Sequence, residues 1–277
     1  MNRIEGRYIS LLTDFGFIRI FGTKPNKDLL INFLNSLFDG FQVIKDVKYL
    51  NSEHVGDVFA ERKPIFDVYC ENEKGEKFIV EMQNASIFPI REQAPKGADW
   101  NFKLDHVYIV ALLNFDLEVE AFDKNDINHD VGLLDKKTHK VFNDKLSFKY
   151  VKIAKFDKTE DELVTLYDKW LYVLKNLSRL DERPAALKEK VFTKLFEEAE
   201  IAKFTPTELK EYEDSLKAYR DIKNSIDTAL EKGREEGRAE SKNLKVIQIA
   251  KKMLAAGMDI DTIINMTDLS KSEIEKL

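Results

Sequence analysis

The chain has 277 residues, of which 43% are hydrophobic and 34% are Asp, Glu, Lys or Arg. This composition is typical of a soluble globular protein with a highly charged, helix-rich part. The formal net charge of −6 argues against a protein that coats nucleic acid through a global positive field, but it leaves room for an enzyme with a locally basic groove.

Two further features limit the cellular setting. No uninterrupted apolar run approaches the roughly 20 residues that span a bilayer, and the first residues lack the apolar region of a signal peptide. The single cysteine, Cys70, cannot form an internal disulfide, and within a strand it favours a small core side chain over a nucleophile. We therefore expect no membrane partner and a cytoplasmic location.

Three elements are expected before the middle of the chain. A short aromatic-rich helix or turn, a longer helix and a strand are predicted at residues 8–22, 26–38 and 43–50. Asn26 is expected to cap the longer helix, and Asp39-Gly40 to end it. That helix is indicated by apolar residues at helical spacing, namely Leu29, Leu30, Phe33, Leu34 and Leu37.

A β-hairpin follows, with arms at residues 65–70 and 77–83 and a polar, Gly-containing turn at 71–76. Each arm carries a carboxylate that a plain core strand does not need, Asp67 in the first and Glu81 in the second. Because strand side chains alternate between faces, Glu81 shares its face with Gln83. The hairpin thus predicts an oxygen-rich corner.

Three more strands are predicted after a loop at residues 86–99. The run 107–115 is almost wholly apolar, as a strand buried on both faces would be, and strands at 131–134 and 146–153 flank an exposed basic turn at 136–140. Residues 1–155 therefore predict an α/β (α+β) core around a mixed sheet.

The second half of the chain predicts helices. A helical extension is expected over 156–230, with a capping box that begins at Thr207. The run 231–243 contains two glycines four residues apart among charged residues and favours a linker or a weak helix. A helical tail at 244–277 is predicted as three short helices, 244–255, 259–266 and 270–277.

The corner of the hairpin suits a Mg²⁺ ion, with Mn²⁺ as an alternative, because such ions prefer oxygen ligands and promote phosphodiester hydrolysis. Asp67, Glu81 and the backbone carbonyl of Met82 are the candidate ligands, and the Gln83 amide could orient a water or a phosphate oxygen. The structural alternative is that both acids face solvent or pair with basic residues nearby. Four scattered histidines show no zinc-ligand spacing.

These segments of the sequence resemble a known family, the PD-(D/E)XK nuclease family transposases, also called recombination-promoting or Rpn-like nucleases. The hairpin segments 62–70 and 78–83 are similar to that family's active-site motif. The likeness extends over nearly the whole chain, in residues 13–17, 21–22, 26–35, 96–100, 170–176, 219–221, 233–237 and 257–258.

The resemblance implies a restriction-endonuclease-like mixed sheet flanked by helices and Mg²⁺-dependent hydrolysis of double-stranded DNA. It gives Asp67 and Glu81 the roles of the motif's two acids and puts Gln83 in the place of its lysine, a replacement typical of the family. It also suggests Asp14 as an assisting acid. One departure is that about a dozen residues of the family pattern are missing after Gln83, where a helix normally follows.

Several alternatives stay open at this point. The chain is either an active endonuclease or an inactive relic that serves as a DNA- or protein-binding module, and residues 160–277 could also mediate self-association into a homo-oligomer. The tail has helix-turn-helix spacing, but acidic residues crowd its last helices, so a small helical cap or a dimerisation element is the alternative. The sequence does not give the cleavage specificity.

Overall fold

The computed structural model describes residues 6–50, 68–82, 105–115, 119 and 121–277. The chain divides into two compact units, Met1–Tyr219 and Arg220–Leu277. The domain boundaries predicted at 155, 230 and 243 remain predictions. Across the described part of the chain, no helix is long and apolar enough to cross a membrane.

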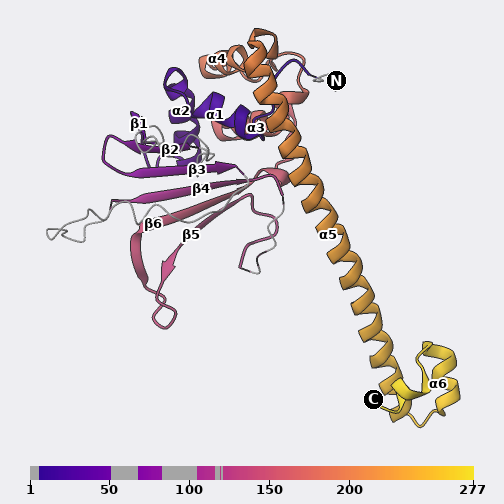
Figure 1. Cartoon of the computed structure of the whole chain (residues 1–277). Helices are drawn as coiled ribbons and strands as arrows, with labels where there is room; N and C mark the ends of the chain where they lie inside the picture. Colours follow the sequence, from indigo (N-terminus) through magenta and orange to yellow (C-terminus); the bar gives the residue numbers. More distant parts are fainter. Residues whose placement is uncertain (1–5, 51–67, 83–104, 116–118, 120) are drawn as a thin grey trace, which may run out of the picture. The chain divides into compact units, whose positions relative to one another are not determined.

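A mixed sheet forms the centre of the first unit (Figure 1). In the described residues its strands run in the order β1-β2-β3-β4-β6-β5. The strands are β1 (Val47–Tyr49), β2 (Val68–Asn72), β3 (Lys77–Met82), β4 (Val107–Leu113), β5 (Asn128–Leu134) and β6 (Val141–Lys152). The central strands β3, β4 and β6 are parallel, and the other pairs are antiparallel. The predicted fold class is confirmed.

The predicted hairpin is β2 and β3. Val68 pairs directly with Val80, and Cys70 with Phe78. The turn forms because the Asn72 side-chain oxygen accepts backbone hydrogen bonds from Lys74 and Glu76, at 3.0 and 2.9 Å, and because Gly75 adopts a φ of 80° that glycine tolerates. Residues 65–67 and 83 of the predicted arms lie outside the described residues.

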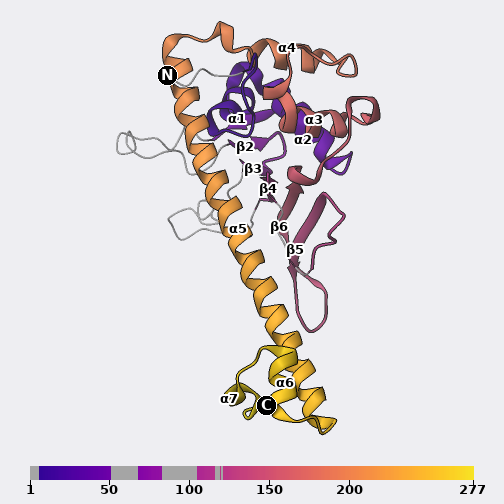
Figure 2. The ribbon, with the colours of Figure 1, turned by 90° about the vertical axis from the view of Figure 1, so that its right-hand side faces the viewer.

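Helices cover one face of the sheet (Figures 1 and 2). They are α1 (Asp14–Phe21), α2 (Lys27–Phe38), α3 (Leu166–Asn176) and α4 (Lys190–Glu198), with 3-10 turns η1 (Lys24–Asn26), η3 (Ile153–Lys155), η4 (Glu160–Glu162), η5 (Leu177–Arg179) and η6 (Ile201–Lys203). Trp170 is fully buried among Phe21, Phe33 and Phe192, with ring centroids 5.1 to 5.6 Å apart. Its indole donates to Asn32 at 2.8 Å, so its one polar group is satisfied inside the core.

Two predicted helix caps were wrong. The Asn26 side chain forms no cap hydrogen bond at the start of α2; its amide donates instead to the Arg19 carbonyl at 3.1 Å. The last helix of the first unit is capped by Thr205 and not by Thr207, since Glu208 lies three residues after Thr205 and completes the reciprocal hydrogen bonds of a capping box.

The helix that begins there, α5 (Pro206–Ala255), runs through the charged segment 231–243 without a break. The alternative of a linker at 231–243 is therefore wrong, as is a separate helix at 244–255. Glu, Lys, Arg and Ala are strong helix formers, and two glycines cost only about 1 kcal/mol each relative to Ala. Gly233 and Gly237 accordingly weaken the helix without ending it.

The second unit closes with two short helices, α6 (Ile260–Thr267) and α7 (Lys271–Ile274). Gly257 and Asp268 make the turns between helices with φ of 76° and 57°, at the breaks expected from the sequence. The helices share a small core in which Ala250, Ile263, Leu269 and Ile274 are buried. Asp259 and Ser270 cap α6 and α7.

Glu208 links the start of α5 to α1. Hydrogen bonds from the Thr205 backbone and, at 2.6 Å, from Arg19 lower the pKa of Glu208 to about 2. Because this pKa is depressed on folding, the carboxylate stabilises the protein above the unfolded-state pKa of about 4.3 and loses that effect as the pH falls towards 2.

We predict that Glu208→Gln lowers the urea midpoint of unfolding at pH 6 and that the difference from wild type shrinks between pH 4.5 and 2. Glu213→Gln, at an exposed position of the same helix, is the control and should leave the midpoint within error at every pH. A difference for Glu208→Gln that stays constant down to pH 2 would contradict the role of the ionised carboxylate.

Candidate active site

The two faces of β3 have different surroundings. Phe78, Val80 and Met82 point into the large core beneath the helices. Ile79 belongs to a second apolar cluster on the opposite face, with Tyr69, Val107, Ile109 and Leu146. Since side chains alternate along a strand, Glu81 lies on the face of this second cluster. The prediction that Glu81 points to the opposite face of the sheet from Val80 and Met82 is confirmed.

Glu81 is buried at the carboxyl end of its strand. Glu81 is only 3% exposed, and its Cα pairs with that of Ala111 on the parallel strand β4. Carboxyl ends of parallel strands meet at one edge of a sheet, where open α/β proteins place their ligand sites. Glu81 thus occupies the kind of position that a site requires.

Buried acids are rare because an ionised carboxylate loses its hydration. Among the described residues, the only other buried acid is Asp168. Burial opposes its ionisation, but hydrogen bonds from Lys158 and from Thr165 hold the pKa of Asp168 below its usual value. Asp168 completes the capping box of α3, which gives it a structural purpose within a helix end.

The remaining predicted site residues are not brought together by the described structure. Asp67 and Gln83 lie outside the described residues. Asp14 is exposed in the first turn of α1, where a carboxylate also favours the helix dipole. The Met82 side chain packs in the core. In the described ranges, no three His, Cys, Asp or Glu side chains form a group that could hold a metal ion.

Sequence reasoning missed Lys152, which is 1% exposed. It pairs with Leu113 at the carboxyl end of β6, on the face of the sheet that also carries Glu81. Its amine donates to the Asp123 carbonyl at 3.2 Å, and its backbone amide donates to the Ile127 carbonyl at 2.8 Å. Lys152 therefore anchors the segment before β5. The apolar-aromatic alternation of β6, interrupted by this lysine, was the available signal.

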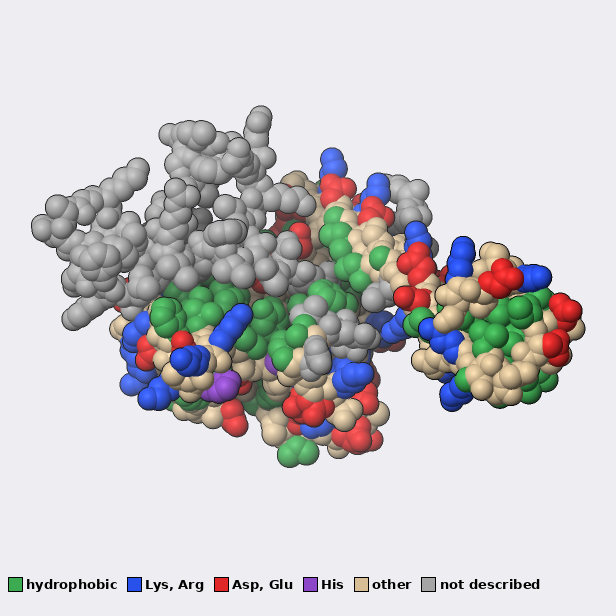
Figure 3. Space-filling model, turned by 90° about the horizontal axis from the view of Figure 1, so that it is seen from below, with side chains coloured by type: hydrophobic (Ala, Val, Ile, Leu, Met, Phe, Trp, Pro, Cys, Tyr) green, Lys and Arg blue, Asp and Glu red, His purple; other side chains and the backbone are tan. Residues whose placement is uncertain are grey.

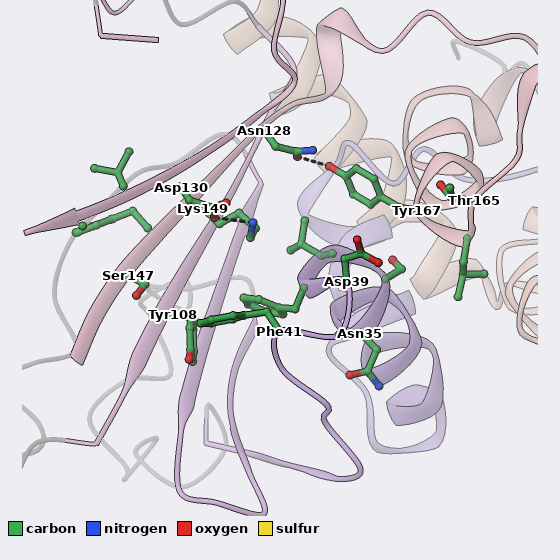
Figure 4. A pocket seen from close by; sticks show the side chains of 18 residues that line it. Asn35, Asp39, Phe41, Tyr108, Asn128, Asp130, Ser147, Lys149, Thr165 and Tyr167 are labelled. Atoms are coloured by element: carbon green, nitrogen blue, oxygen red, sulfur yellow. Dashed lines mark hydrogen bonds and ion pairs between the residues drawn. The ribbon is translucent and has the colours of Figure 1, made fainter. Parts of the chain in front are cut away.

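A cavity of about 950 Å³ lies on the helix-covered face, between α2, α3 and the strands β4 to β6 (Figure 4). Several of its polar side chains already bind one another or the backbone. Asp130 pairs with Lys149 at 2.5 Å, Tyr167 donates to Asn128, and Asn35 exchanges two hydrogen bonds with the backbone of Ile44 at 2.8 Å. Lys149 and Glu81 extend from opposite faces of the sheet, so this cavity is separate from the candidate active site.

Cys70 is a core residue. It is fully buried among the apolar side chains beneath the helices, and this burial raises the pKa of its thiol to about 12. Since the thiolate is the nucleophile, Cys70 is chemically inert in the folded protein.

We predict that a disulfide reagent such as DTNB labels Cys70 at pH 8 only at the rate of unfolding. In 6 M guanidinium chloride one thiol per chain should react at once, and because the sequence has a single cysteine the readout is unambiguous. Rapid labelling of the native protein would show that the thiol is accessible and contradict its place in the core.

Comparison with protein families agrees with this architecture. Residues 11–229 match the PD-(D/E)XK nuclease family transposase model, and residues 243–277 match the C-terminal helix-turn-helix domain of the Rpn/YhgA-like nuclease family. The chain therefore belongs to the PD-(D/E)XK nuclease family transposases, and its tail is similar to the C-terminal helix-turn-helix domain of the Rpn/YhgA-like nucleases. No curated protein and no solved structure matches the chain.

Proposed function

We propose that this protein is an endonuclease that hydrolyses phosphodiester bonds in double-stranded DNA with a divalent metal ion, Mg²⁺ or Mn²⁺. Family membership supports nuclease activity. The observation that carries the proposal is the burial of Glu81 at the carboxyl ends of paired parallel strands, a position where a carboxylate is costly unless hydrogen bonds or a cation compensate it.

Asp67 and Glu81 are the proposed metal-binding acids. Asp67 is bonded to Val68 and Glu81 to Val80, and these two valines are directly paired. Asp67 itself lies outside the described residues, so its place beside Glu81 is part of the proposal. We propose that the two carboxylates bind one ion, in keeping with the oxygen ligands that Mg²⁺ prefers.

The other roles follow the family motif. The Met82 carbonyl is proposed as a further ligand, and Gln83 as the group that orients the attacking water or a phosphate oxygen, since an amide cannot act as a base near neutral pH. Asp14 is proposed to assist. When bound, the metal ion supplies positive charge at the scissile phosphate and lowers the pKa of a water molecule.

DNA is the proposed partner, because the tail matches a helix-turn-helix model and this class of domain places a helix in the major groove. Self-association through residues 160–277 and a reducing, cytoplasmic setting remain proposals, the latter resting on the single cysteine. The name transposase describes family ancestry, and strand transfer forms no part of the proposal.

We predict that the protein nicks supercoiled plasmid in the presence of Mg²⁺ or Mn²⁺ and not in EDTA. Glu81→Gln and Asp67→Asn should each lower the nicking rate about 100-fold or more, because each removes a charge that acts on the reacting groups. Glu71→Gln, a half-buried position on the same hairpin, is the matched control and should retain the wild-type rate.

Circular dichroism of each variant separates loss of activity from loss of fold. Isosteric replacement of Glu81 should preserve the wild-type spectrum. Absence of cleavage by the folded wild-type protein with either metal would overturn the nuclease proposal and favour the inactive relic, while full activity of Glu81→Gln would overturn the assignment of the site.

A further inference from the structure

The C-terminal half of α5 carries a row of basic side chains. Arg234, Arg238, Lys242 and Lys245 line one shallow hollow of about 530 Å³, together with Gly237 and Ser241. At 100° per residue, Arg234, Arg238 and Lys245 fall within about 40° of one another around the helix axis, with Lys242 at their side. We call these four side chains the basic stripe.

The charges of the basic stripe are available to a partner. All four side chains are exposed, and within the described residues none of them takes part in an ion pair, whereas Lys232 on another side of the helix pairs with Glu236 at 3.8 Å. Glu236 and Glu240 point away from the stripe, on the opposite half of the helix. Asp227, Glu231 and Glu235 line a neighbouring hollow together with Arg234 and Arg238, so acidic residues lie beside the N-terminal half of the stripe, whereas Lys242 and Lys245 line only the first hollow.

Gly237 leaves the helix backbone uncovered within the hollow. No heavy atom lies within 4 Å of the position that a Cβ would take there, so nothing inside the protein occupies this space. A phosphate group can therefore approach the helix more closely beside Gly237 than beside a residue with a side chain, with Arg238 and Ser241 within reach as donors.

The charge of the second unit differs from that of the rest of the chain. Residues 220–277 contain eleven Lys and Arg and eleven Asp and Glu, so the formal charge of −6 resides entirely in residues 1–219. On the face seen in Figure 3 the second unit combines basic, acidic and hydrophobic side chains. Within this neutral unit the basic stripe is a local concentration of four positive charges.

Two acids of the tail have structural roles at helix starts, and this weakens the argument that the acidic residues of the tail oppose DNA binding. Hydrogen bonds from the Thr262 and Ser270 side chains lower the pKa values of Asp259 and Glu273, and both carboxylates are engaged at helix starts. α7 itself has little positive charge for phosphate contact, because it contains one lysine, Lys271, and one glutamate, Glu273. The basic stripe adds four positive charges to this unit.

We propose that the basic stripe of α5 contacts the phosphate backbone of duplex DNA beside the helix-turn-helix. This inference rests on the proposed DNA partner but not on the proposed chemistry. Lys245 already lies within the residues matched to the helix-turn-helix, and α5 continues into them without a break. In helix-turn-helix proteins the helix before the recognition helix crosses the DNA backbone, so an extension of the first helix is placed to follow it.

The test measures binding without cleavage. Full-length protein is titrated in EDTA into a fluorescent 25-base-pair duplex, and the anisotropy gives the binding constant at several KCl concentrations from 50 to 200 mM. Arg238→Gln/Lys245→Gln removes two charges of the stripe. Lys232→Gln/Lys251→Gln removes two exposed positive charges from other sides of the same helix and is the matched control.

We expect the stripe variant to lower the slope of log K against log[KCl] by about 2, because each lost phosphate contact removes about 0.9 from the slope, and to weaken binding about 10-fold or more at 100 mM KCl. The control should keep the wild-type slope. An equal loss in both variants, or in neither, would overturn the proposal. Binding to a polyglutamate peptide is measured in the same way. A stripe variant that loses binding to this peptide while its DNA slope is unchanged would also overturn the proposal.

Failure of this inference is distinguishable from failure of the nuclease proposal. If the protein binds DNA with the expected slopes but never nicks plasmid, the proposal for the basic stripe stands and the nuclease proposal is overturned. If the protein nicks plasmid through Glu81 while the stripe variant binds DNA like wild type, the nuclease proposal stands and the proposal for the basic stripe is overturned.

Discussion

The position of β3 within the sheet is the constraint on which the rest of the first unit depends. This strand pairs antiparallel with β2 and parallel with β4, so it joins the hairpin to the parallel part of the sheet. One face is held in register by Phe78 and Val80 in the core beneath the helices. A slip of one residue would exchange the two faces and put Glu81 into that core.

Several acids of the structure lie at helix starts and have visible structural tasks, whereas Glu81 is buried on a strand. Asp168, Glu208 and Glu273 accept backbone hydrogen bonds at helix starts, and the pKa of each is lowered there. Glu81 lies on a strand, between apolar side chains, at the edge where parallel strands end. In the proposed function this carboxylate binds the metal ion.

In the proposed function the two units divide the physical requirements of a DNA enzyme between them. The first unit carries the acidic balance of the chain and a site in which a metal ion would offset negative charge at the phosphate. The second unit is neutral and concentrates basic side chains along one helix. A protein with a formal charge of −6 can therefore bind a polyanion, because the attraction is local and its range at physiological salt is only about 8 Å.

The sequence by itself determined the elements whose signals are local. Alternation and the Asn72–Gly75 turn define the hairpin, and apolar spacing defines α2. Even the true start of α5 had a local signal, because Thr205-Pro206 with Glu208 is a better capping box than the one at Thr207. The candidate acids Asp67 and Glu81 came from the same alternation, and the family's motif was carried by residues on the hairpin.

Only the tertiary structure decided the features that depend on distant residues. The burial of Lys152 arises because residues 123 and 127 supply carbonyls to it, and no spacing near Lys152 encodes that contact. The separation of the 950 Å³ cavity from Glu81 follows from strand order and register. The continuity of α5 through residues 231–243 reflects summed helix propensity over many residues, which outweighs two glycines that read locally as a break.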